Sequence, residues 1–170
     1  HSLARLAQAR QFESLPTAEY MEPVQQNQIQ LQRWASQAPM NYQHKYDLVA
    51  AELARCQGRI TEAMKLYEQA IDGANAEGYL QEVALANELA ADFYIALGHD
   101  KIAHLFLAEA HSAYLTWGAL AKVKDLQQHY PHLGAGVSSR APHHALHSMV
   151  ATVTTATTLS VDSPLDFTTV

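Results

Sequence analysis

Ten histidines are the residues of this sequence best suited to chemistry, because imidazole binds metal ions and exchanges protons near neutral pH. His104 and His111 are seven residues apart, which places them on one face of a helix, and Asp100 lies four residues before His104. A zinc site needs three or four ligands that converge on one point. We therefore interpret this stretch as an exposed helix face with a weak Asp100–His104 pair, and we predict no metal site.

The single cysteine, Cys56, is the other residue with reactive potential. Its neighbours Leu53 and Ala54 belong to an apolar helical stripe that ends at Gly58. A reactive thiolate needs an accessible, electropositive setting, so we predict a buried structural thiol instead. One cysteine cannot form an internal disulfide, which fits a reducing compartment, and we expect a cytoplasmic protein.

The sequence lacks the short motifs that carry nucleotide binding or catalysis. It contains no G-x-x-x-x-G-K-[ST], G-x-G-x-x-G, H-R-D, D-F-G or G-x-S-x-G. We predict no catalytic and no cofactor-binding residue in this segment. The net charge is −6 and Lys and Arg are scattered, whereas nucleic-acid binding needs clustered positive charge. No stretch reaches the roughly 18 apolar residues that a membrane span needs. We therefore expect neither a nucleic-acid nor a membrane partner.

The elements that would position any site are helices. Only 7 glycines and 6 prolines are present, and apolar residues recur with helical period. Pro23 suits a first helical turn, and Thr61 is a plausible N-cap. The predicted helices cover residues 23–38, 45–57, 61–76, 80–97, 100–117 and 119–130. They end at Pro39, Gly58, Gly98, Gly118 and Pro131, where helix terminators belong.

The two ends of the chain differ from this pattern. Residues 1–22 stay unassigned, although Leu3, Leu6 and Ala7 could continue a helix begun upstream, and we interpret the chain as a piece of a longer polypeptide. Residues 134–170 hold 12 Ser or Thr, no Lys, no Glu and one aromatic, Phe167. We predict that they form a flexible linker to a following domain, with a strand at 153–159 as the alternative.

An internal repeat is the most informative feature. Gly58 and Gly98 are 40 residues apart, and residues of similar size lie at equal offsets from them. The matched pairs are Ala51 and Ala91, Ala54 and Tyr94, Ala63 and Ala103, Tyr67 and Leu107, and Ala70 and Ala110. Small residues suit close helix crossings, and glycine suits a turn that needs positive φ.

This spacing resembles the tetratricopeptide repeat, in which antiparallel helix pairs stack into a solenoid with a concave face. The family period is 34, so 40 implies longer helices. We predict an all-α, tetratricopeptide-like domain over residues 23–133, with an unrelated antiparallel helical bundle as the alternative. Aromatic residues at helical spacing are expected to pack in the core or between repeats. They are Trp34, Tyr67, Phe93, Tyr94, Phe106, Tyr114 and Trp117.

Three longer strings resemble one particular family. They are LQRWASQAPMNYQHKYDLVAAE at 31–52, ANELAADFYIALGHDKIAHLFLAEAHSAYLTWGALAKVKDLQQHYP at 86–131 and LDFTTV at 165–170. They are similar to the helical segment of large multi-domain sensor kinases. That family joins a Ser/Thr-kinase-like domain, an AAA/STAND ATPase, a helical array, a GAF domain and a histidine kinase. Its catalytic residues lie in domains that these 170 residues do not contain, so none is transferred here.

The resemblance implies a non-catalytic helical scaffold that couples an ATPase module to a GAF and histidine-kinase output. The parent chain would be an ATP-dependent protein kinase. Expected partners are neighbouring domains of the same chain, or a peptide on the concave face. The alternatives are a stand-alone peptide-binding adaptor and the helical effector segment of a STAND-type transcription regulator.

Overall fold

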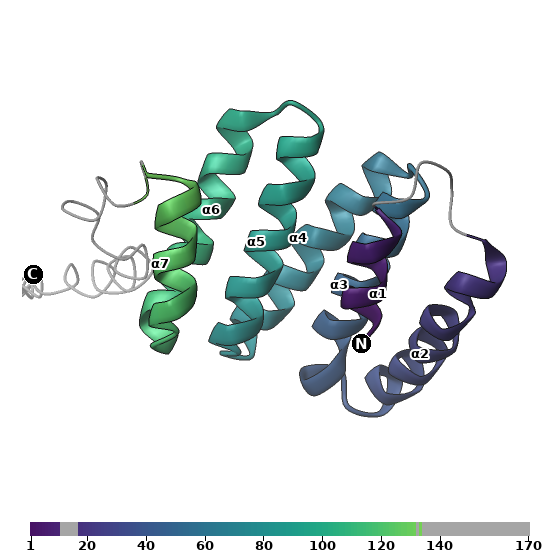
Figure 1. The fold of residues 1–170 in the computed structure, drawn as a ribbon. Coiled ribbons are helices and arrows are strands. Elements are labelled where there is room, and N and C mark those ends of the chain that lie inside the picture. The colour runs from purple at the N-terminus through teal and green to yellow at the C-terminus, as the bar shows by residue number, and fades with distance from the viewer. Residues whose placement is uncertain (11–16, 132, 134–170) are drawn as a thin grey trace, which may run out of the picture. The chain divides into compact units, whose positions relative to one another are not determined.

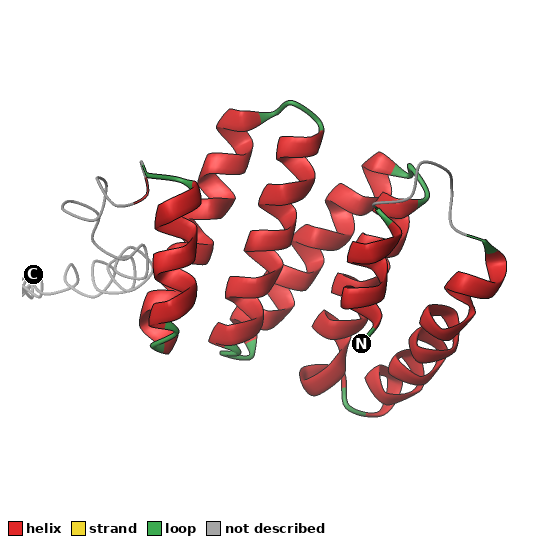
Figure 2. Ribbon diagram, viewed as in Figure 1, coloured by secondary structure: helices red, strands yellow, loops and turns green. Residues whose placement is uncertain are grey.

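The computed structural model describes residues 1–10, 17–131 and 133, and this part of the chain is helical without strands (Figures 1 and 2). The all-α class is therefore confirmed there, while the tetratricopeptide-like solenoid stays a prediction. The predicted linker and the alternative strand at 153–159 lie outside the described residues. The helices are α1 (Ser2–Ala9), α2 (Ala18–Gln37), α3 (Pro39–Cys56), α4 (Ile60–Ala76), α5 (Leu80–Ala96), α6 (Asp100–Trp117) and α7 (Leu120–His129).

Helix α1 lies within residues 1–22, the stretch left unassigned by the local sequence pattern. Leu6 is fully buried, and together with Ala9 it packs in a small core that also contains Met21, Val24 and Val49. These residues come from α1, α2 and α3, and α1 lies against α3 and α2 (Figure 1). Residues 2–9 therefore contribute to the core of the helical part.

Three predicted helix starts are wrong, and one of them is that of α3, which begins at Pro39 instead of residue 45. Helix α2 begins at Ala18, not at Pro23, because the Thr17 hydroxyl accepts a hydrogen bond from the Tyr20 amide at 3.3 Å and caps the helix earlier. Pro23 consequently lies inside α2. Thr61 is not the N-cap of α4 either, because α4 begins at Ile60 with Arg59 in the cap position and no side-chain cap bond.

The turns between α3 and α7 repeat every 20 residues, which is half the period predicted from the sequence. Gly58, Gly78, Gly98 and Gly118 all have positive φ, between 70° and 85°. At Gly58, the glycine amide donates to the Arg55 carbonyl, and the Arg59 amide donates to the Ala54 carbonyl. The same two bonds recur at the other three glycines. This pattern is the Schellman motif, which satisfies carbonyls at a helix end.

Gly78 provides a direct test of these turns. A Cβ added there would meet nothing within 4 Å, so only the backbone conformation opposes a side chain. We expect Gly78→Ala to lower the free energy of unfolding by about 1–2 kcal/mol, the cost of a left-handed residue. Gly78→Asn should cost less, since asparagine tolerates this conformation. Urea denaturation of both variants measures the difference, and equal stability of Gly78→Ala and the wild type would contradict the positive φ.

The predicted repeat positions are buried, with clear exceptions. Ten of them are at most 4% exposed: Ala51, Ala54, Ala63, Tyr67, Ala70, Ala91, Tyr94, Ala103, Leu107 and Ala110. Gly58 and Gly98 lie in turns. Trp117 was expected to pack but is 52% exposed, and Trp34 is 44% exposed. Trp117 directly precedes a turn glycine, and the residues at the same position before Gly58 and Gly78 are also exposed.

Candidate functional site

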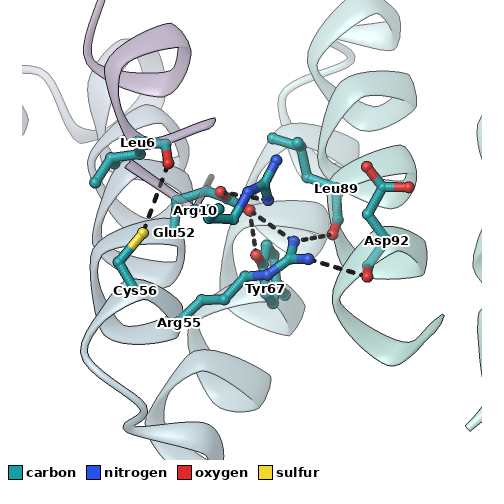
Figure 3. A network of polar contacts seen from close by, with 8 residues as sticks. All are labelled: Leu6, Arg10, Glu52, Arg55, Cys56, Tyr67, Leu89 and Asp92. Carbon is teal, nitrogen blue, oxygen red and sulfur yellow. Dashed lines mark hydrogen bonds and ion pairs between the residues drawn. The ribbon is translucent and has the colours of Figure 1, made fainter. Parts of the chain in front are cut away.

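A buried carboxylate lies at the centre of the polar network in Figure 3. Glu52, on α3, is 1% exposed. Its Oε2 accepts a hydrogen bond from Arg10 at 3.0 Å, and its Oε1 accepts from Arg55 at 3.4 Å and from the Tyr67 hydroxyl. A buried charge needs such pairing, because an isolated one is very costly to remove from water. The network thus joins the end of α1 to α3 and α4.

Arg55 extends this network to α5. Its Nη2 donates to the Asp92 carbonyl at 3.0 Å, and its Nη1 lies 3.5 Å from the Leu89 carbonyl (Figure 3). The guanidinium also lies 5.8 Å from the centre of the Phe93 ring. A guanidinium offers five hydrogen-bond donors in a fixed plane, so a single arginine can bind a carboxylate and two carbonyls at the same time. One arginine therefore connects α3 with α5.

The two protic groups beside Glu52 are held in their neutral forms. Burial and the negative charge of Glu52 raise the pKa of the Tyr67 hydroxyl well above its ordinary value, so it stays protonated and donates to Glu52. Burial, followed by the charge of Glu52, also raises the pKa of Cys56. The Cys56 thiol is half-buried rather than fully buried, and it lies 3.7 Å from the Leu6 carbonyl. Neither group has the setting of a nucleophile.

The next repeat does not reproduce this arrangement. Asp92 is six residues before Gly98, as Glu52 is before Gly58, but Leu107 replaces Tyr67. Burial raises the pKa of the Asp92 carboxyl, although the charge of Arg55 opposes this shift. In the second repeat, Glu88 rather than Asp92 is the carboxylate that connects neighbouring helices.

Glu88 connects three helices by a separate polar cluster. Its two carboxylate oxygens accept from the Tyr114 hydroxyl at 2.6 Å and from Lys122 at 2.7 Å. Burial lowers the pKa of Lys122, but the bonds and charges of Glu88 and Asp125 together outweigh it and raise that pKa overall. Helices α5, α6 and α7 are linked in this way, by a different set of residues from the one at Glu52.

A third polar cluster joins α3 to the start of α5. His44 is 3% exposed, contacts Glu82 through Nε2, and stacks on Tyr79 with ring centres 5.0 Å apart. Lys45 lies 3.2 Å from the other oxygen of Glu82. The backbone of α4 approaches closely here, since a Cβ on Gly73 would lie 3.2 Å from the Cβ of His44.

The two histidines considered for metal binding, His104 and His111, have different surroundings. His104 is exposed, but His111 is 5% exposed and its Nε2 lies 3.0 Å from Nε2 of Gln127 on α7. The predicted shared exposed face is therefore wrong for His111, because α7 packs over it. Within the described residues, no group of three or more His, Cys, Asp or Glu is placed to hold a metal ion.

Sequence reasoning missed the charged residues that connect the helices. Tyr67 was predicted as a packing residue, and the structure adds its bond to Glu52. Arg10, Glu52 and Arg55 were not singled out. The available signal was Glu52 itself, a charged residue between Ala51 and Ala54 in the apolar stripe of α3.

Comparison with known proteins gives one partial similarity. The chain is 42% identical over 55 residues to "Hybrid signal transduction histidine kinase G" of Dictyostelium discoideum. The match covers 32% of this chain and 2% of that much longer relative. No protein-family model and no solved structure matches the chain. Across the described residues, the helices are too short or too polar to cross a membrane.

Proposed function

We propose that this chain is a non-catalytic helical scaffold of a large cytoplasmic signalling kinase. In this proposal it couples an ATPase module to a GAF and histidine-kinase output, and the parent chain is an ATP-dependent protein kinase. The partial similarity to a signal-transduction histidine kinase supports the link to sensor kinases. The resemblance of residues 31–52 and 86–131 to the helical segment of such kinases points to the same family.

The observation that carries the scaffold role is the Glu52 network. Arg10, Tyr67 and Arg55 bring α1, α4 and α5 to one point on α3. A movement imposed on α1 would strain these bonds and shift the position of α5, because packed helices with fixed polar contacts move as units. A neighbouring domain attached before α1 could in this way influence one attached after α7.

Autophosphorylation of the full-length kinase tests this proposal. Arg55→Ala removes the bonds from α3 to α5, and we expect it to weaken the response of autophosphorylation to stimulus several-fold. Arg59→Ala is the matched control, since Arg59 is 45% exposed and its side chain bonds to Gln57 and Glu62, which lie within three residues of it. An unchanged stimulus response in Arg55→Ala, with the helical segment still folded, would contradict the coupling role.

A peptide-binding adaptor is the second candidate, and the docking of α1 favours it. This short helix buries Leu6 and reaches Glu52 through Arg10, so it covers part of α3 as an apolar and basic peptide would. A chain beginning at Thr17 should then bind a peptide of residues 1–10, measurable by calorimetry. A peptide with Leu6→Asp and Arg10→Glu is the control. Equal binding of both peptides would exclude this surface as a specific site.

A further inference from the structure

The outward face of α6 carries large apolar side chains that nothing in the described chain covers. Leu105 is 65% exposed, Trp117 52%, Leu115 44% and Ile102 40%. Ala108 and Ser112, which lie between them on the helix, are exposed as well. Trp117 lies two residues after Leu115 and therefore on another side of the helix, so we call the other five residues the α6 face. Contiguous exposed apolar residues of this kind mark interaction surfaces on soluble proteins.

The corresponding face of α4 is polar. The buried positions of α4 and α6 match at an offset of 40 residues, as Ala63 with Ala103 and Ala70 with Ala110 show. The same offset relates the α6 face to five exposed residues of α4, namely Glu62, Lys65, Glu68, Asp72 and Asn75. Since the two helices share one register, the fold itself does not require apolar residues at these positions.

A further helix pair of the same kind would not cover the α6 face. The α4 face stays exposed although α5 and α6 follow it directly in the array. An additional pair packed in the same manner would leave the α6 face exposed in the same way. The occupant must therefore be something other than the next repeat.

We propose that the α6 face binds the same face of a second copy of this chain, with the two α6 helices antiparallel. Residues 105, 108, 112 and 115 follow the 3-4-3 spacing of a helix-packing seam. Their sizes are symmetric about position 110, with Leu105 opposite Leu115 of the other copy and Ala108 opposite Ser112. A two-fold interface requires such self-complementarity, because each patch meets itself reversed. The small central pair lets the helices approach closely.

The size and charge of the face set the strength of this dimer. An 18-residue helix is about 27 Å long and about 10 Å wide, so the contact is far smaller than the roughly 800 Å² per partner of a standard interface. The two copies of Glu109 would lie near the two-fold axis and repel each other. We therefore expect a dimer that dissociates on dilution and strengthens with added salt, which screens this repulsion.

Analytical ultracentrifugation of the whole chain over about 5–500 µM tests the proposal. The wild type should shift from monomer to dimer across this range. A variant that carries the corresponding α4 residues at the large apolar positions of this face, Ile102→Glu, Leu105→Lys and Leu115→Asn, should stay monomeric. The control places the same new residues at exposed apolar sites elsewhere: Ile29→Glu, Met40→Lys and Ile60→Asn. It should dimerise like the wild type. A monomeric wild type throughout, or loss of the dimer in the control alone, would overturn the proposal.

Disulfide cross-linking tests the orientation. In a Cys56→Ala background, Ala108→Cys and Ser112→Cys chains are oxidised separately and as a mixture. The antiparallel arrangement predicts that the mixture forms the linked dimer several-fold more efficiently than either chain alone, since position 108 faces position 112 of the other copy. Equal linking of each chain with itself would indicate a parallel or random encounter and contradict the proposed geometry.

Discussion

Replacing Glu52 with leucine should lower the free energy of unfolding by about 3 kcal/mol. Removing one partner of a buried ion pair typically costs about 3–5 kcal/mol, because the remaining charge stays buried without compensation. We expect the lower end, since the Arg10 side chain is 26% exposed and can turn to water, and Arg55 keeps its bonds to the α5 carbonyls. Chemical denaturation monitored by far-UV circular dichroism measures the loss.

Two further variants show whether the network causes this loss. Glu62→Leu likewise replaces a glutamate that is paired with an arginine. The Arg59–Glu62 pair is about half exposed, however, so it should contribute less than about 1 kcal/mol to the free energy of unfolding. Tyr67→Phe deletes only the hydroxyl that donates to Glu52. Glu52→Leu and Tyr67→Phe together should cost less than the sum of the two single changes, because they remove one shared bond. Full additivity would indicate that Glu52 and Tyr67 act independently.

The helices could be predicted from the sequence because their signals are local. Glycine at a helix end and apolar residues at period 3.6 each act within a few residues. Helix α6 was predicted with its observed bounds of Asp100–Trp117 for this reason. Helix α1 was not assigned, because eight residues give a weak periodic signal and its stability comes from packing against α3.

The 20-residue spacing of the turns was missed because residue types hide it. Val83 and Asn87 follow Gly78 at the offsets where Ala63 and Tyr67 follow Gly58, and all four are buried. Matching by similar side chains finds only Gly58 and Gly98, which are every second turn. Burial and the hydrogen bonds of each turn reveal the 20-residue unit, and neither is visible in the order of residue types.

The polar network depends on distances that a sequence does not contain. Arg10 and Glu52 are 42 residues apart, and Arg55 reaches a carbonyl 37 residues away. Buried Glu52 and exposed Glu62 both lie on amphipathic helices, so a helical pattern by itself does not show which of them is buried. A charged residue within an apolar stripe is a hint, but its partners become known only when α1, α4 and α5 are placed around α3.

Truncation of Phe93 should destabilise the protein far more than truncation of Trp117, although sequence spacing predicts packing for both. Phe93 is 1% exposed, and its ring centre lies 5.3 Å from that of Tyr67 and 5.2 Å from that of Tyr94. Phe93→Ala should lower the free energy of unfolding by about 3–5 kcal/mol, through lost burial and the cavity that remains. Trp117→Ala should cost less than about 1 kcal/mol, because half of the side chain already faces water.

Both variants should be compared at low micromolar protein, where self-association through the α6 face does not add to apparent stability. Phe93→Leu serves as the milder control and should lose clearly less than Phe93→Ala, since it fills most of the space between α3, α4 and α5. A large loss in Trp117→Ala under these conditions would mean that α6 is rotated from its observed orientation. The buried positions of Ala103, Leu107 and Ala110 would then be wrong as well, because one helix cannot turn Trp117 inward without moving the other side chains on its surface.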